Sequence, residues 1–197
     1  MKTTLVKISL TLVAVIALGL AVFIGLRSYQ ALQGPALEPW HTYVPQELTP
    51  EEIDATDWAG YLQAEARVFE EVRREVVQKL PLADQVPENR YFADSAVYPP
   101  RLSHDWNHSY ELHPDGSPVG AVVLLHGLTD SPYSLRHIAQ HYRERGFVAV
   151  AIRLPAHGTV PAALTAVQWP AWLAATRLAV REAVQAAGPG KPLHIVG

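Results

Sequence analysis

The sequence predicts an α/β protein in which parallel strands alternate with helices, preceded by a membrane-spanning helix and a helical extension. Short apolar runs at residues 121–125, 147–152 and 192–196 have the length of strands that are buried on both faces. Two stretches with the apolar spacing of amphipathic helices separate these runs. Because consecutive parallel strands are joined by right-handed helical crossovers, this alternation favours one parallel sheet.

The composition excludes several classes of protein. The chain of 197 residues is 49 % hydrophobic and 18 % charged, which is ordinary for a globular protein with one sizeable core. A net charge of -3 provides no basic surface, so no nucleic-acid partner is expected. The absence of cysteine excludes disulfides, thiolate zinc sites, a cysteine nucleophile and a lipid-modified anchor cysteine. Neither a metal nor another cofactor is expected.

The amino terminus has the pattern of a membrane anchor. Ile8–Leu26 is uncharged and mostly apolar, and at 1.5 Å per residue a helix over this run spans about the ~30 Å hydrocarbon core of a bilayer. Lys2 and Lys7 precede the run and only Arg27 follows it closely, so the positive-inside rule keeps the amino terminus in the cytoplasm. Residues 1–27 therefore predict a single crossing of the lipid bilayer, with the main domain on the outer, periplasmic or extracytoplasmic side.

A cleaved signal peptide is the alternative interpretation of this run. Ala17-Leu18-Gly19 and Gly19-Leu20-Ala21 have the small-x-small spacing of a cleavage site, but both lie inside the apolar run and not after it. A buried core helix is a third interpretation. The uncleaved anchor is favoured, and both the anchor and the signal peptide imply export.

Residues 28–115 predict an extension built around helices. Thr49, Pro50 and Glu52 supply an N-cap, a first-turn proline and a capping-box glutamate, so a helix begins there. From Asp57 to Leu80, apolar residues recur at three- and four-residue steps, which predicts an amphipathic helix packed against another element. Its apolar positions are Trp58, Tyr61, Leu62, Phe69, Val72, Val76 and Leu80.

The charges of that helix and the segment after it are expected at the surface. The possible pairs Glu70–Arg74 and Glu75–Lys79 predict a solvated face and not a binding patch. Pro81–Pro118 then carries repeated Pro, Asn, Asp and Gly residues around the short runs Arg90–Phe92 and Ser109–Leu112. This pattern indicates edge strands and loops.

Residues 116–197 contain the predicted strands and two further helices. Asp130 or Ser131 caps the first helix, Pro132 lies in its first turn and Gly146 ends it. The apolar stripe of this helix is Leu135, Ile138, Ala139 and Tyr142. The second helix covers about residues 167–187 and stops at Gly188-Pro189-Gly190. Its expected inward residues are Trp172, Leu173, Val180, Val184 and Ala187.

The candidate functional residues follow the predicted strands. His126-Gly127-Leu128-Thr129-Asp130 comes after the first strand, Arg153-Leu154-Pro155-Ala156-His157-Gly158-Thr159 after the second, and Gly197 after the third. Because open α/β sheets place their sites at the carboxyl ends of parallel strands, these segments are expected to meet.

These three segments resemble the α/β-hydrolase family, in the branch that includes carboxylesterases, monoacylglycerol lipases and serine aminopeptidases. The resemblance covers about Gly120–Gly197 and implies an incomplete α/β-hydrolase fold, with the first half of that domain at residues 116–197. It also implies hydrolysis of a carboxylic ester, with a small lipophilic ester as the substrate of the complete protein. Peptidase activity is the alternative within the same branch.

The resemblance also implies roles for individual residues. The N–H of Leu128 is the expected oxyanion donor, and the surrounding residues His126, Gly127 and Thr129 support its loop. His126 is expected to brace the loop and not to transfer a proton. His157 and Gly158 shape the loop after the second strand. Relatives carry Gly-His-Gly where this chain has Ala156, which leaves open whether that turn needs a positive φ.

The sequence does not contain the catalytic serine that the resemblance implies. In the family a G-x-S-x-G turn carries the nucleophile, and the acid and the histidine base follow it. No G-x-S-x-G occurs in this sequence, and Gly197 is the expected first glycine of that turn. The expectation is therefore a fragment of a hydrolase that is inactive by itself. The alternative from another class is a membrane-anchored binding module without catalysis.

Other motifs carry less weight. His137 and His141 are four residues apart, as in zinc peptidases, but Ile138 replaces the glutamate and no third ligand is evident. His104 and His108 are expected at the surface. Gly188–Lys191 follows a helix and precedes a strand, the reverse of a phosphate-binding loop, and is interpreted as a turn.

Overall fold

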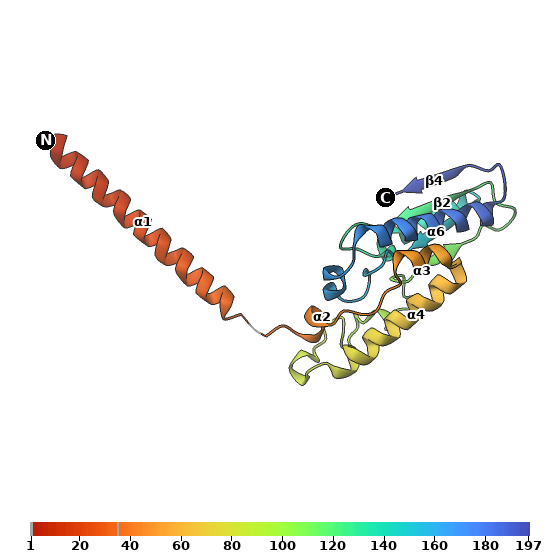
Figure 1. Cartoon of the computed structure of the whole chain (residues 1–197), viewed down its shortest axis with the longest axis horizontal. Coiled ribbons are helices and arrows are strands. Elements are labelled where there is room, and N and C mark those ends of the chain that lie inside the picture. The colour runs from red at the N-terminus through yellow and green to blue at the C-terminus, as the bar shows by residue number, and fades with distance from the viewer. Residues whose placement is uncertain (1, 35) are drawn as a thin grey trace. The chain divides into compact units, whose positions relative to one another are not determined.

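The computed structural model describes residues 2–34 and 36–197, in two units that comprise Met1–Leu37 and Glu38–Gly197. In the first unit, one continuous helix, α1, runs from Lys2 to Leu32 (Figure 1). Its segment Leu10–Leu32 has a mean hydropathy of 2.4 and is long and apolar enough to cross a membrane. A signal sequence has the same properties. The helix extends beyond the predicted run, which ended before Arg27.

The second unit contains a four-stranded sheet in the order β1-β3-β2-β4. The strands are β1 (Tyr110–Leu112), β2 (Gly120–Leu125), β3 (Phe147–Ile152) and β4 (Leu193–Val196). Strand β2 pairs in parallel with both β3 and β4, whereas β1 pairs antiparallel with the outer edge of β3. The predicted α/β class with a mostly parallel sheet is confirmed.

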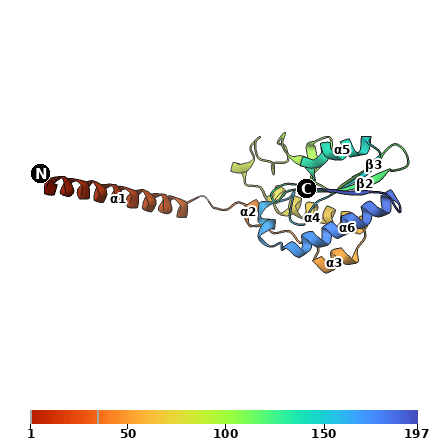
Figure 2. The ribbon, with the colours of Figure 1, turned by 90° about the horizontal axis from the view of Figure 1, so that it is seen from above.

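Helices cover both faces of this sheet, as Figure 2 shows. Helices α3 (Pro50–Ala55), α4 (Trp58–Glu75) and α6 (Trp169–Ala187) lie on one face, and α5 (Arg136–Glu144) lies on the other. Successive strand residues point to opposite faces of the sheet and pack into a hydrophobic core on each face. Val123 thus faces α6, while its neighbour Val122 faces α5. Residues 38–115 therefore belong to the same packed unit as the sheet. The short helices are α2 (Pro39–Thr42) and the 3₁₀ turns Val77–Lys79, Leu82–Asp84, Pro99–Arg101, Pro132–Leu135 and Pro161–Thr165.

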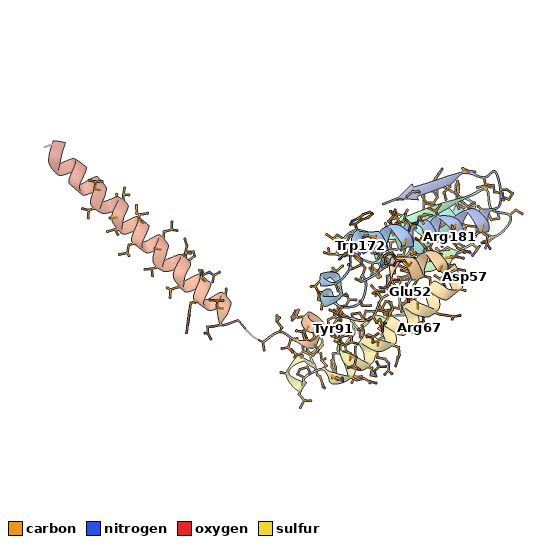
Figure 3. All side chains as sticks on the ribbon, viewed as in Figure 1. Glu52, Asp57, Arg67, Tyr91, Trp172 and Arg181 are labelled. Atoms are coloured by element: carbon orange, nitrogen blue, oxygen red, sulfur yellow. The ribbon has the colours of Figure 1, made fainter. Side chains whose placement is uncertain are left out.

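The predicted helix starts in the extension agree with the structure. The Thr49 hydroxyl accepts the N–H of Glu52, whose carboxylate accepts the N–H of Thr49, so the capping box is formed. Asp57 caps α4 by accepting the N–H of Gly60 at 2.8 Å. Figure 3 labels Glu52 and Asp57 at these two neighbouring helix starts.

Three predictions for α4 and its surroundings are wrong. Glu70 pairs with Arg73 and not with Arg74, whereas the predicted Glu75–Lys79 pair is present. The charges do not all lie on a solvated face, because Glu65 is 2 % exposed and points into the protein. Arg90–Phe92 forms turns and not a strand, since the Tyr91 N–H is taken by the Asn89 side chain.

The inward face of α6 differs from the predicted one. Leu173 and Val184 are 44 % and 49 % exposed, although both were expected to point inward. Alanines face the sheet instead, and their small side chains let the helix backbone approach the strands closely. The buried residues of α6 are Ala171, Ala174, Ala175, Leu178, Ala179, Ala183 and Ala187.

Helix α5 begins later than predicted. A 3₁₀ turn at Pro132–Leu135 precedes it, and the Ser131 side chain donates to Asn107 Oδ1 instead of capping the helix. Ile138, assigned to the apolar stripe, is 38 % exposed, while Ala139 is fully buried. Gly146 ends the helix with a φ of +86°, as the sequence predicts.

Candidate functional site

The three predicted segments meet at the carboxyl edge of the sheet. Leu125 and Ile152 are partners at the ends of β2 and β3, so the loops that follow them start side by side. A Cβ at Gly197 would lie 3.3 Å from the Leu125 carbonyl oxygen, so the end of β4 lies at the same edge. The three segments therefore meet at one edge of the sheet, as the sequence predicts.

His126 links the loop after β2 to the loop after β3. Its Nε2 accepts the N–H of Leu154 at 3.0 Å, which assigns the ring proton to Nδ1, and Nδ1 donates to the Gly127 carbonyl at 3.0 Å. Burial lowers the pKa of His126 to about 4, so the imidazole is neutral at pH 7. Both ring nitrogens are bonded to backbone, and the residue is 6 % exposed.

The Leu128 N–H is oriented by the peptide that precedes it. In a trans peptide the N–H points away from the preceding carbonyl, and the Gly127 carbonyl is held by His126 Nδ1 and by the N–H of Asp130 at 3.1 Å. Among residues 2–34 and 36–197, no group accepts the Leu128 N–H, and the Leu128 side chain is 63 % exposed. An oriented N–H of this kind is available to an anion.

His157 makes the second link between the two loops. Its Nε2 lies 2.6 Å from the Leu128 carbonyl oxygen, and its Nδ1 lies 3.0 Å from that of Pro155. The His126 and His157 rings are 4.9 Å apart. Trp172 of α6 donates to the same Pro155 oxygen at 3.1 Å, and Tyr91 of the extension donates to the Thr159 carbonyl at 3.1 Å (both labelled in Figure 3).

The loop after β3 contains two left-handed residues. Gly158 has a φ of +73°, and Ala156 has a φ of +72° without being glycine. This answers the question that the sequence left open, because the turn does require a positive φ at Ala156. A left-handed conformation costs an L-residue about 1–2 kcal/mol, so the surroundings of Ala156 must hold it there.

A buried ion cluster fixes the start of this loop. Arg153 is 1 % exposed, and its guanidinium contacts two carboxylates of the extension, Glu47 and Glu65. Its backbone is held as well, because the Arg153 N–H donates to Ser109 Oγ at 2.8 Å and its carbonyl accepts the Tyr61 hydroxyl at 2.6 Å. Burial alone would lower the pKa of Arg153, but the two carboxylates outweigh burial and raise it.

Glu65 stays ionised although it is buried. Burial raises the pKa of its carboxyl, but a hydrogen bond with His108, the charge of Arg153 and hydrogen bonds from Ser109 outweigh burial and lower the pKa. The surface assignment of His108 is therefore wrong in part, because its ring also stacks on Phe69 at 3.7 Å. His104 is exposed, as expected.

Sequence reasoning singled out neither Glu47 nor Glu65, and it gave Arg153 no role of its own within the candidate segment after the second strand. A signal for Glu65 was present, because it lies four residues after Tyr61 on the apolar stripe of α4, where a charge must have a partner. Glu47 lies outside any regular element, and no pattern in the sequence indicates its contacts.

The serines of this region are not arranged as nucleophiles. Ser109 Oγ donates to Glu65 Oε2 at 2.6 Å and accepts the Arg153 N–H, and Ser131 Oγ donates to Asn107 at 2.8 Å. Neither hydroxyl contacts a histidine in the described ranges. His141 pairs with Arg145, and within residues 2–34 and 36–197 no three side chains are grouped to hold a metal ion.

A cavity of about 350 Å³ opens beside the two loops. Its walls include Thr129 and Asp130 from the loop after β2 and His157 to Thr159 from the loop after β3. Arg90 and Tyr91 of the extension complete one side. The cavity can admit a small organic group.

Comparison with known proteins gives a partial match. No family model matches the sequence. A stretch of 48 residues, 24 % of the chain, is 40 % identical to the thermostable monoacylglycerol lipase of Bacillus sp. (strain H-257) and covers 19 % of that lipase. A solved structure from work on the metagenome-derived lipolytic enzymes LipS and LipT is 26 % identical, with a TM-score of 0.41, over 46 % of this chain and 34 % of that one. The chain thus spans about a fifth of the curated relative's length, and the similarity indicates an α/β-hydrolase-like relationship over part of the chain.

Proposed function

We propose that residues 38–197 form the oxyanion-loop half of a serine hydrolase of the α/β-hydrolase fold that cleaves carboxylic esters. The main support is the Leu128 N–H, which is oriented at the carboxyl edge of the sheet and has no acceptor among the described residues. The similarity to a monoacylglycerol lipase supports the same class of reaction.

The proposed chemistry is acyl transfer. A serine oxygen adds to the ester carbonyl carbon, and the carbonyl oxygen becomes an oxyanion as its double bond opens. The Leu128 N–H donates to that oxygen, a contact that typically stabilises the transition state by ~3 kcal/mol. His126 and His157 act on the loops and not on the substrate, because both nitrogens of His126 are bonded to backbone and the ring of His157 faces the Leu128 and Pro155 carbonyl oxygens. We place the serine two residues after Gly197, followed by the acid and the histidine base.

The substrate is proposed to be a small lipophilic ester such as an acylglycerol, for two reasons. The α1 segment Leu10–Leu32 can hold the protein at a membrane, where such esters are concentrated. The cavity beside Thr129 and His157 has room for part of an ester substrate. Lys2 and Lys7 favour an orientation with the second unit outside the cytoplasm.

The test is to sequence the codons after Gly197 and to express the full reading frame. The proposal expects Ser-x-Gly within a few codons and labelling of that serine by a fluorophosphonate probe. The matched control replaces that serine with alanine, which should abolish both labelling and hydrolysis of p-nitrophenyl esters. A stop codon directly after Gly197, or a full-length protein that neither labels nor hydrolyses esters, would contradict the proposal and favour a non-catalytic binding module.

A further inference from the structure

Glu47 of the extension connects to the candidate site through three hydrogen bonds. Its carboxylate forms a bidentate salt bridge with Arg153, in which Oε1 lies 2.8 Å from Nη1 and Oε2 lies 2.9 Å from Nη2. Oε1 also accepts the N–H of Ala156 at 2.8 Å, so the carboxylate touches the strained residue of the loop. The Glu47 side chain is 16 % exposed, and this partial burial strengthens these contacts relative to a surface pair.

Arg153 connects Glu47 to the backbone of His157. Nη1, which binds Glu47, also donates to the His157 carbonyl at 3.1 Å. The guanidinium is held on its other side by Glu65, with Nε 3.2 Å from Oε2. The backbone of His157 is thereby fixed with respect to the extension, and its ring is positioned against the Leu128 carbonyl.

Both peptides that flank Leu128 depend on the loop after β3. The Leu128 carbonyl is bonded to His157, and the Gly127 carbonyl is bonded to His126, whose other nitrogen takes the Leu154 N–H. Leu154 and His157 lie on either side of Ala156, the left-handed residue whose N–H donates to Glu47. A movement at Ala156 therefore changes both histidine contacts.

We propose that Glu47 is a positioning residue that sets the direction of the Leu128 N–H, through Arg153 and the two histidines. Its role in catalysis rests on the proposed ester hydrolysis, whereas its effect on the Leu128 peptide can be measured without any reaction. The extension then helps to orient the groups of the candidate site, in addition to connecting α1 to the sheet.

The experiment is an NMR comparison of the full 197-residue chain, isotope-labelled and held in detergent micelles. Glu47→Gln keeps the size of the side chain and removes the charge, so it should shift the Leu128 amide and the His157 ring nitrogens together. Exchange of the Ala156 N–H with solvent should rise ~10-fold, because a charge-assisted hydrogen bond becomes a neutral one. Glu47→Asp retains the charge on a shorter side chain and should shift the same signals part of the way.

Glu71→Gln is the matched control. The Glu71 carboxylate also holds the extension, by accepting the Tyr43 hydroxyl and the N–H of Gln46, but it does not touch the loop after β3. This variant should leave the Leu128 and His157 signals in place. Equal shifts from both variants would show a general loosening of the extension and would overturn the proposal.

Unchanged Leu128 and His157 signals in folded Glu47→Gln would also overturn it. If Glu47→Gln does not fold, Glu47→Asp decides by the same criterion. In the full-length ester hydrolase, Glu47→Gln should lower kcat ~10-fold and leave KM unchanged, because an oxyanion donor acts in the transition state. If the full-length protein lacks a nucleophile, the proposed ester hydrolysis is wrong, but the effect of Glu47→Gln on the Leu128 and His157 signals would still be observed. Failure of the proposed function and failure of the proposed Glu47 role are therefore distinguishable.

Discussion

At the scale of single residues, the candidate site is defined by backbone groups that side chains hold in place. His126 and His157 each bridge the two loops: both ring nitrogens of His126 are bonded to backbone, and the nitrogens of His157 face the carbonyl oxygens of Leu128 and Pro155. The proposed donor to a substrate is the N–H of Leu128, whose own side chain is mostly exposed. Substitutions at Leu128 should therefore act through the backbone.

Leu128 should tolerate alanine and not proline in the proposed full-length ester hydrolase. Leu128→Ala keeps the N–H and should retain most of the turnover number. Leu128→Pro removes the N–H and should lower turnover ~100-fold or more. Thermal melting must show that the proline variant is folded. A folded proline variant with the parent's turnover would exclude Leu128 as the oxyanion donor.

His126 should make the stability of the chain depend on pH. Burial depresses its pKa to about 4 in the folded state, against about 6.5 when unfolded. Between these values the unfolded chain binds a proton that the folded chain does not, so the free energy of unfolding falls as the pH falls from 6.5 towards 4. The loss attributable to His126 should reach ~2 kcal/mol.

Urea unfolding from pH 7 to pH 4.5 measures this dependence, and His126→Gln is the comparison. Gln does not titrate, so the variant should show a shallower decline in stability over the same range. Parallel curves for the two proteins would assign the pH dependence to other groups, Glu65 among them.

Ala156 should respond to substitution as a left-handed residue does. Ala156→Gly relieves the strain but loses a buried methyl group, so stability should change by about 1 kcal/mol or less. Ala156→Val places a branched side chain at a φ of +72° and should cost ~2 kcal/mol or more. Ala186→Gly, in the helical backbone of α6, is the control and should cost ~1 kcal/mol. A tolerated valine at Ala156 would contradict the assigned backbone.

At the scale of elements, helix α6 packs through its small residues. Seven of its positions are buried, and six of these are alanine. The larger apolar residues Leu173 and Val184 face outward. The helix can therefore lie close to β2 and β3, and its core contacts leave little room for added volume.

On α6, enlarging a buried alanine should destabilise the protein, whereas truncating an exposed leucine should have little effect on its stability. Ala179→Leu adds volume at a fully buried position and should lower the free energy of unfolding by ~1–3 kcal/mol. Leu173→Ala removes a half-exposed side chain and should change it by ~0.5 kcal/mol or less. Chemical denaturation of the full chain in micelles measures both, and a large loss for Leu173→Ala would mean that this face is covered.

At the scale of the whole molecule, the chain joins an apolar helix to an α/β unit that contains the candidate site. The extension is integral to that unit, since β1 belongs to the sheet and α3 and α4 pack on the same face as α6. For the proposed membrane anchor, the orientation of α1 determines on which side of the membrane the α/β unit lies.

The orientation can be tested with single cysteines, because the chain has none of its own. Ser117→Cys places a thiol at an exposed position of the α/β unit and should react with a membrane-impermeant maleimide on intact spheroplasts. Thr3→Cys should react only after lysis. The reverse pattern would place the α/β unit in the cytoplasm, and a lower mass lacking the Thr3→Cys thiol would indicate cleavage.

The sequence alone determined most of the elements and the edge of the sheet at which the candidate segments meet. Runs such as residues 121–125 and stop signals such as Gly146 and Gly188 act locally, so their periodicity and turn chemistry are visible in the sequence. The His126 and His157 motifs likewise follow their strands directly.

The tertiary structure decided which faces pack and what orients the site. Arg153 meets Glu65 and Glu47 across separations of 88 and 106 residues, and no local pattern encodes such a pairing. Which face of α6 points inward depends on close packing of its alanines against the strands. The hydrophobicity of the α6 residues alone does not predict that face. The direction of the Leu128 N–H depends on two imidazoles and a buried ion cluster, because a peptide plane is fixed by the partners that bind its carbonyl.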